Sequence, residues 1–465
     1  MKNRQQLLTG SIWSLLLKFT LPAIVGMAGF ALYNIVDRIF IGRALGTIAL
    51  AAVGLSFPVF GFFIAVGMLI GIGGGTLVSL YMGAGEKEQA NIVLGNVFIL
   101  FLIISVVMVL AGIFFLEPLL VFFGAGPATM PYAKPYLFII LVSAVFGHIS
   151  FGMNNIVRAE GSPAMAMNTM LIGAVVNTVL DYIFIFPLKM GVVGAAVATA
   201  IAQAISSAWI IYHFTLSPRR VLHLEFSAFR LRPDIIKRIF GIGLSPFFLQ
   251  IAASFVTFLT NHSLLRYGGD IAVGAMGVIN SVMMFVLMPT FGVNQGAQTI
   301  MGFNYGAGLY GRVRKTLIIA CAAAAGIAII GTAVLELVPG ALVDAFGKGD
   351  LELRRIAIPG MRIFLLFLPL TAFQVIGANY FQAVGRPKKS IFLNILRVGL
   401  LFIPLVLILP RFFGIFGIWI AGPVSDFFSA IITLFFLFRE AGKLSAGTGS
   451  GDIAEDDAWD TAPEA

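Results

Sequence analysis

Long apolar runs recur along this chain, and its few charged residues gather between them. Charged residues make up 11% of the sequence, whereas a soluble domain carries roughly 25%. A run of about 20 apolar residues is long enough to cross the hydrocarbon core of a bilayer as a helix. The sequence therefore predicts an all-α integral membrane protein.

The apolar runs predict twelve transmembrane helices. The first run begins near Leu15 and continues to Phe40, so it is too long for the apolar region of a signal peptide and is interpreted as a membrane helix. The twelve predicted spans are roughly 15–41, 51–80, 93–116, 134–157, 165–187, 191–214, 238–264, 273–302, 316–338, 357–382, 391–410 and 414–437.

Lys and Arg residues set the predicted orientation of these spans. They are roughly twice as numerous in the loops on the side of the two termini as on the opposite side, so both termini are predicted to be cytoplasmic. This topology also explains the net charge of +9 without a nucleic-acid partner. The tail from 442 to 465 is rich in Gly and Ser and then acidic, and it is predicted to be disordered.

The chain repeats itself with a shift of 223 residues. Residues 48–85 align with 271–308 without a gap, and Gly73, Thr76 and Gly83 meet Gly296, Thr299 and Gly306 in that alignment. A second match, shifted by 224, pairs Asn155, Gly161 and Pro163 with Asn379, Gly385 and Pro387. Each repeat holds six helices, and an even number keeps both repeats in the same orientation. The prediction is two parallel six-helix lobes, 1–225 and 226–441, an architecture known among transporters.

Two acids interrupt the apolar runs of the first repeat. Asp37 lies in the first predicted helix, and Asp181 lies in the run from Met165 to Pro187. An Asp at a helix centre costs about 2.5–3.5 kcal/mol on insertion scales, and such residues usually mark an ion or proton pathway. In the second repeat Asp181 aligns with Leu405, and Asp37 aligns with Thr260 or Asn261. A purely structural role would be harder to confine to one repeat, so we expect a dedicated ion site.

Two further polar side chains are expected near these acids. Asn177 precedes Asp181 by four residues, so the two share one helix face. Thr199 falls at a similar depth on the next helix. Carboxylate, amide and hydroxyl oxygens suit hard cations, and two neighbouring carboxylates also favour a bound proton. The coupling ion can thus be H⁺ or Na⁺. The alternatives are that these groups only join helices by hydrogen bonds, or that Asp37 pairs with Arg38.

The second repeat carries a smaller set of polar candidates. Asp426 either forms an ion pair with Arg397 on the adjacent helix or contacts a cationic substrate. Helix-packing roles and substrate contacts are both open for the remaining candidates, which are Gln250, Gln295, Gln298, Gln374 and Met288.

Enzyme signatures are missing from the sequence. It contains no GxSxG, no HExxH and no Walker A lysine loop, so neither an enzyme nor a transporter driven by its own ATP hydrolysis is predicted, and no cofactor beyond the coupling ion. An ion gradient is the remaining energy source.

These features resemble the multidrug and toxic compound extrusion family of cation-coupled exporters, in its bacterial branch. The resemblance covers about 1–440 and is carried by the two six-helix repeats and by the motifs YMGAGEKEQA, RAEGSP and NTVLDYIFIF. It implies a cation site at Asp37, Asn177, Asp181, Thr199 and Asn154.

The resemblance also implies a function. A member of this family exports bulky, often cationic drugs or metabolites in exchange for H⁺ or Na⁺ by alternating access, from the inner membrane of a bacterium, and a monomer is expected. The alternative is a flippase for lipid-linked or polysaccharide intermediates of the same superfamily. Such proteins usually have a strongly basic cavity, and the intramembrane charge here is mainly acidic.

Overall fold

The computed structural model describes residues 2–218, 220–225, 230–347 and 350–445, and every regular element in these ranges is a helix. The predicted all-α fold is confirmed for this part of the chain. The last helix ends at Ser445, so the predicted disorder of the tail falls outside the described residues from 446 onward.

The chain forms two compact units that are not its two halves. Unit 2 contains Leu21–Val78 and Glu86–Ser254. Unit 1 contains Met1–Thr20, Ser79–Gly85 and Phe255–Ala465. The start of the chain therefore belongs with the second repeat, and residues 233–254 belong with the first. The division into lobes at residues 225 and 226 stays a prediction.

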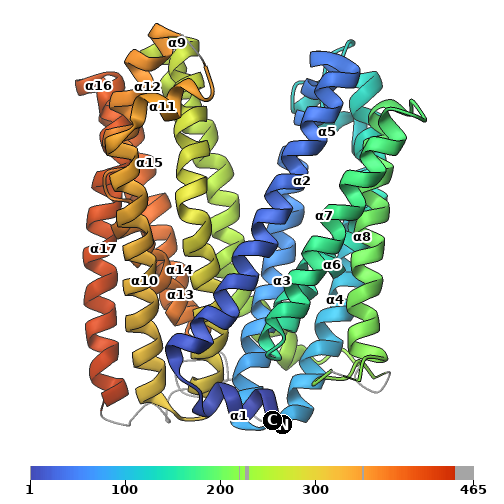
Figure 1. Cartoon of the computed structure of the whole chain (residues 1–465), viewed down its shortest axis with the longest axis vertical. Coiled ribbons are helices and arrows are strands. Elements are labelled where there is room, and N and C mark those ends of the chain that lie inside the picture. The colour runs from blue at the N-terminus through green and yellow to red at the C-terminus, as the bar shows by residue number, and fades with distance from the viewer. Residues whose placement is uncertain (1, 219, 226–229, 348–349, 446–465) are drawn as a thin grey trace, which may run out of the picture. The chain divides into compact units, whose positions relative to one another are not determined.

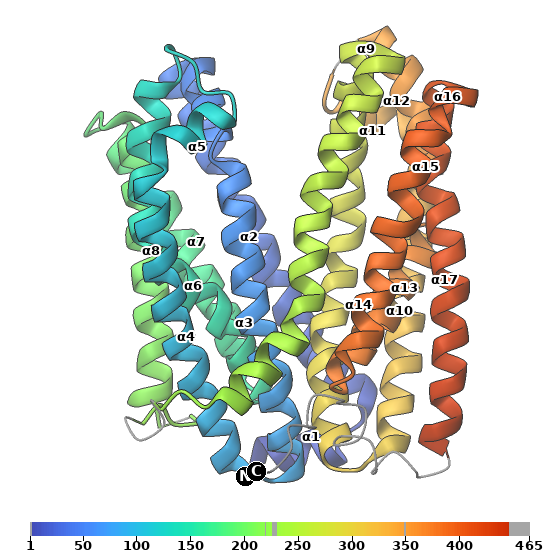
Figure 2. The same cartoon turned by 180° about the vertical axis from the view of Figure 1, so that it is seen from behind.

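Unit 2 is organised around its longest buried helix, α6. This helix packs against α8, α4 and α7, and α7 also packs against α8. Figures 1 and 2 both show these helices side by side. As a result, the polar residues of α7 face an interior built from α6 and α8. The helices are α2 (Ile12–Gly54), α3 (Phe57–Ala84), α4 (Lys87–Phe114), α5 (Leu116–Phe122), α6 (Met130–Ala159), α7 (Pro163–Ile185) and α8 (Gly191–Thr215).

Unit 1 is organised around α13, which packs against α10, α17 and α14. Figure 1 shows these helices in yellow to red. The helices are α1 (Lys2–Thr9), α9 (Pro233–Gly306, from Phe255 onward), α10 (Tyr310–Leu337), α11 (Pro339–Asp344), α12 (Leu351–Phe364), α13 (Leu368–Ala383), α14 (Pro387–Ile395), the π-helix η2 (Leu396–Phe402), α15 (Ile403–Ile408), α16 (Pro410–Phe413) and α17 (Ile415–Ser445).

The count of transmembrane spans depends on how α9 is divided. Within the described residues, ten helices are long and apolar enough to cross a bilayer, and the bent pair α12 and α13 makes an eleventh span. Helix α9 has 74 residues, about 110 Å at 1.5 Å per residue, whereas the bilayer core is about 30 Å thick. Its backbone breaks at Gly269, where φ is 70° and ψ is −170°. Division there gives the twelve predicted spans.

Gly46 in α2 breaks its helix in the same way, with φ 81° and ψ −175°. It lies 223 residues before Gly269, the shift found in the sequence. Glycine populates positive φ without the steric penalty of a Cβ atom. The same backbone device therefore follows the first helix of each repeat, and the internal duplication is visible in the structure.

Two predicted spans are less regular than expected. The helix predicted at 357–382 is broken between Phe364 and Leu368, and α12 and α13 meet at 47°. Pro369 lies in the first turn of α13, where a proline cannot continue a preceding helix because it lacks an N–H. The helix predicted at 391–410 contains η2, whose wider turns begin one residue before Arg397. Such π-helical turns occur often at functional sites.

Candidate functional site

The carboxyl groups of Asp37 on α2 and Asp181 on α7 lie close together inside unit 2. Asp181 is fully buried and Asp37 is partly buried. Neither carboxylate can donate a hydrogen bond when both are ionised. Contact between the two groups therefore requires a positive charge, either a proton that they share or a bound cation.

Asn177 and Thr199 complete one side of this cluster. The Asn177 Nδ2 atom donates to Thr199 Oγ1 on α8 at 3.2 Å, and both side chains are buried. The NH₂ group is the only hydrogen-bond donor of the Asn177 side chain, and this bond directs it to the neighbouring helix α8. The Asn177 carboxamide oxygen is thereby left as an acceptor, one helical turn from Asp181. The structure thus brings together four of the five residues expected in the cation site.

The cluster is rich in acceptors and poor in donors. In the part of the chain that the structure describes, both Asp181 carboxylate oxygens, Asp37 Oδ1 and Asn177 Oδ1 are buried without a hydrogen-bond donor. Most buried polar atoms have a partner, and an unpaired buried charge is strongly unfavourable. Four such oxygens in one place are an arrangement suited to a proton or to a hard cation with oxygen ligands. The residues present fit either ion.

Arg38, the alternative partner considered for Asp37, instead contacts the ring of Phe57. The Arg38 Cζ atom lies 4.4 Å from the centroid of the Phe57 ring, in a cation–π contact. Among the described residues, no ion pair joins Arg38 to Asp37. Arg38 therefore exerts only a longer-range attraction on the acid pair, and Asp37 stays available to a bound ion.

Two tyrosines lie close to the acid pair and were not expected from the sequence. The Tyr33 and Tyr136 side chains are both within electrostatic range of Asp37 and Asp181. Tyr33 precedes Asp37 by one helical turn, a spacing that could have revealed it. Tyr136 begins α6 with no such signal.

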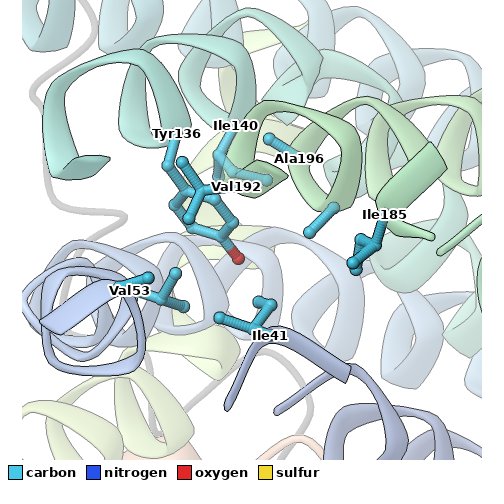
Figure 3. Packing of buried hydrophobic residues seen from close by; sticks show 9 residues of the cluster. Ile41, Val53, Tyr136, Ile140, Ile185, Val192 and Ala196 are labelled. Atoms are coloured by element: carbon cyan, nitrogen blue, oxygen red, sulfur yellow. The ribbon is translucent and has the colours of Figure 1, made fainter. Parts of the chain in front are cut away.

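Figure 3 shows the surroundings of Tyr136. Its ring is packed among apolar side chains, and its hydroxyl points into the space between Ile41 and Ile185. Both of these residues lie one turn from the acids, on α2 and α7. A buried apolar cluster thus packs around the tyrosine beside the polar one.

Asn154, which the resemblance placed in the cation site, has its side chain occupied elsewhere. Its Oδ1 atom accepts from Arg158 Nη1 at 2.5 Å, and its Nδ2 atom donates to Ala166 O at 2.8 Å. The first bond lies within α6, and the second ties the end of α6 to the beginning of α7. Both ends of the carboxamide are committed, so we leave Asn154 out of the proposed ion site.

Asp426 forms an ion pair inside unit 1. Its Oδ1 atom accepts from Arg397 Nε at 2.8 Å, and its Oδ2 atom accepts from Thr371 Oγ1 at 2.7 Å. Ser425 Oγ also donates to the Arg397 carbonyl oxygen at 2.7 Å, and Arg397 lies within the π-helical turns of η2. Each carboxylate oxygen has a donor. Of the two roles open from the sequence, the structure favours the ion pair, and we do not propose a substrate role for Asp426.

The glutamine candidates do not form one group. Gln250 belongs to unit 2, whereas Gln295, Gln298 and Gln374 belong to unit 1, and the role of Gln250 as a substrate contact stays a prediction. Gln374 is fully buried and donates to Leu393 O at 3.3 Å, which is a helix-packing bond. Gln295, Gln298 and Met288 are half-buried on α9, and their roles as substrate contacts stay predictions.

A family model described as MatE matches the chain twice, at residues 22–183 and 246–408. The two matches begin 224 residues apart and together cover more than half of the chain. They follow the internal repeat, one match to each copy.

Curated relatives and solved structures match nearly the whole chain. Multidrug export protein MepA of Staphylococcus saprophyticus is 27% identical over 414 residues, covering 88% of this chain and 89% of the relative. MepA of Staphylococcus haemolyticus is 25% identical over 442 residues, covering 95% and 96%. The structure of a MOP superfamily transporter from Pyrococcus furiosus superposes with a TM-score of 0.90 at 27% identity, covering 96% of this chain and 99% of that one.

A second solved structure matches the chain equally well. An outward-facing multidrug resistance MATE family transporter also superposes with a TM-score of 0.90 at 27% identity. The motifs, the duplicated six-helix fold and these matches agree: the chain is a helical membrane protein that belongs to the MatE family.

Proposed function

We propose that this protein is a secondary antiporter that exports bulky, often cationic organic compounds in exchange for H⁺ or Na⁺. The observation that carries the proposal is the acceptor cluster of Asp37, Asn177 and Asp181, whose buried oxygens have no hydrogen-bond donor among the described residues. The two staphylococcal relatives are multidrug export proteins, which supports drugs as the exported compounds.

The ion would act through the acid pair. A proton on one carboxyl group lets it donate to the other, and a Na⁺ ion would be held by both carboxylates and the Asn177 carboxamide oxygen. Either ion removes the repulsion between the two acids, so the occupied and empty clusters favour different arrangements of α2 and α7. A ligand shifts such an equilibrium by the difference between its affinities for the two states. Alternating access to the two sides of the membrane would follow from this difference.

The second repeat supports one ion site per chain. Leu405 and Leu401 stand where Asp181 and Asn177 stand in the first repeat. Asp426, an acid within a predicted span of the second repeat, is paired with Arg397. This pair also leaves Arg397 unsuited to a phosphate, so the structure gives no support to the flippase alternative.

The proposed setting is the cell membrane, with both termini in the cytoplasm and the protein as a monomer. The excess of Lys and Arg in the loops on the side of the termini supports this topology.

Transport of a fluorescent cationic dye in liposomes tests the proposal. Purified protein should accumulate the dye in the compartment where H⁺ or Na⁺ was initially concentrated, because the two fluxes run in opposite directions. Dye flux that is unchanged after the ion gradient is collapsed would disprove coupling. Separate H⁺ and Na⁺ gradients identify the ion.

A further inference from the structure

Glu160 holds the segment that joins α8 to α9. Its Oε1 atom is paired with His213 Nε2 near the end of α8. Its Oε2 atom accepts from the backbone N–H groups of Val221 and Leu222 at 3.3 and 3.2 Å. The side chains of Glu160 and His213 are 0% and 4% exposed. One buried carboxylate thus receives three donors, two of them from the joining segment.

Two asparagines of α4 hold the same segment further along. The Asn91 Oδ1 atom accepts from His223 N at 2.9 Å. Asn96 Oδ1 accepts from Arg232 N at 2.8 Å, and its Nδ2 atom donates to Arg230 O at 3.2 Å. Side chains of unit 2 therefore satisfy backbone groups on both sides of residues 226–229. We call the described residues 220–225 and 230–232 the strap.

The strap leads into a helix that is itself fixed to unit 2. A Cβ atom built on Gly243 of α9 would lie 1.8 Å from Leu69 O of α3, and one on Gly73 of α3 would lie 2.1 Å from Ile239 O of α9. The two backbones touch at both glycines. The first part of α9 is thus packed on α3 at one end and tied to the strap at the other.

The second repeat joins the equivalent helix ends through a different buried pair, Arg386 after α13 and Glu440 of α17. Val384 and Leu437 stand at the positions of Glu160 and His213, with the shift of 224 that also relates Pro163 to Pro387 and the first residues of α8 and α17. Val384 and Leu437 cannot form an ion pair, so the pairing of a residue after α6 with one near the end of α8 at these two positions is specific to the first repeat.

We propose that Glu160 and His213 form a latch that locks the strap to unit 2, so that the strap and the beginning of α9 move as part of that unit. The latch acts on backbone N–H groups, so its strength does not depend on the side chains of the strap. Opening it exposes the Arg220–Val221 peptide bond, whose N–H donates to Glu160. The latch does not rest on the proposed antiport, and its test reads the strap directly.

The test is proteolysis and hydrogen exchange of the full chain in detergent. Trypsin cleaves after Arg220 only when the strap leaves Glu160, so the rate reports the open fraction. Glu160→Gln keeps the size of the side chain but replaces an acceptor with a donor, and it cannot serve three N–H groups. We expect cleavage at Arg220–Val221, and exchange of the Val221 and Leu222 amides, to become about tenfold faster. Glu88→Gln, an exposed carboxylate on α4, is the matched control and should behave as wild type.

A second pair of variants keeps the test decisive if Glu160→Gln does not fold. Asn91→Ala and Asn96→Ala remove the other anchors and should accelerate exchange of the His223 and Arg232 amides, respectively. A folded Glu160→Gln protein with wild-type cleavage and exchange would overturn the latch. If Glu160→Gln does not fold, wild-type exchange of the His223 and Arg232 amides in Asn91→Ala and Asn96→Ala would also overturn the proposal.

Discussion

Asp37 on α2 and Asp181 on α7 hold their carboxyl groups close together, and no donor among the described residues bonds either Asp181 oxygen or Asp37 Oδ1. Apolar side chains and two tyrosines surround the pair. A contact of this kind is stable only with a positive charge present, so the fold of unit 2 and the binding of an ion are coupled. Removal of either charge should therefore change transport and stability in opposite directions.

Asp37→Asn and Asp181→Asn should each reduce gradient-driven dye export to the level of liposomes without protein. An asparagine keeps the shape and one oxygen but cannot carry the charge that the coupling ion neutralises. The new amide donates to the remaining carboxylate, so the free energy of unfolding should stay level or rise by about 1 kcal/mol. Dye transport and thermal unfolding of the same preparations measure both effects.

Asp270→Asn serves as the control for these variants, because Asp270 is an exposed carboxylate next to Gly269 in unit 1. It should export dye as the wild type does. Normal export by both asparagine variants at equal protein level would show that the acid pair is not the coupling site.

Asp181→Leu should insert and fold but fail to couple export to an ion gradient. Leu405 occupies the equivalent position of the second repeat, so the repeated fold already accommodates leucine there. Replacing an Asp by Leu within a transmembrane helix favours insertion by about 3 kcal/mol. Membrane yield, measured by immunoblot, should therefore be equal to or above that of the wild type, while dye export is lost.

The reverse change supplies the comparison. Leu405→Asp places a carboxylate where no Asn or second Asp accompanies it, and it should lower the membrane yield severalfold. Equal yields for both changes would mean that the two repeats do not differ in their tolerance of charge.

The fold could be predicted largely because a bilayer imposes a simple rule. Apolar runs of fixed length define the spans, and the repeat identified their grouping. The break at Gly269 lies in the predicted gap between the spans 238–264 and 273–302. The bend before Pro369 was not predicted, because it depends on one ring within an apolar run.

Within the site, the sequence was informative where polar residues are rare. Asp37, Asn177 and Asp181 stand out among apolar neighbours, and their meeting follows from helix packing. Tyr136 did not stand out, because tyrosine is ordinary at the beginning of a transmembrane helix. The hydrogen bond from Asn154 to Ala166 O could not be predicted either, because it depends on how the end of α6 turns into α7.

Arg397 and Asp426 should show strong coupling in a double-mutant cycle. Loss of one partner leaves the other charge buried and unpaired, which typically costs about 3–5 kcal/mol. We expect Asp426→Asn or Arg397→Gln alone to lower the unfolding temperature and the yield, and the double variant to recover most of the loss. Thermal unfolding of the four proteins gives the coupling free energy. Additive effects of the two changes would contradict a structural pair.

A substrate role for Asp426 makes a different prediction. In that case Asp426→Asn would weaken export of cationic dyes and spare neutral compounds, at an unchanged unfolding temperature. Comparison of one cationic and one neutral compound separates this outcome from a general loss that follows protein level.

His223 should make the strap open more readily in acid. Burial lowers the pKa of His223, the charges of Lys87 and Arg220 lower it further, and Glu225 and Glu160 oppose them. A lowered pKa means that the docked strap binds the proton less tightly than the free strap does. Docking is therefore strongest above the ordinary histidine value of about 6.5 and weakens as the pH falls through it.

The effect can be isolated by comparison with His223→Gln, which cannot be protonated and keeps the backbone N–H that donates to Asn91. We expect the Val221 and Leu222 amides of the wild type to exchange at the rate of the variant near pH 7.5 and about threefold faster than the variant near pH 5.5. Taking the ratio of the two proteins at each pH cancels the intrinsic pH dependence of amide exchange. A ratio that stays constant over this range would show that His223 does not control the strap. Protonation of His223 would then not weaken docking of the strap.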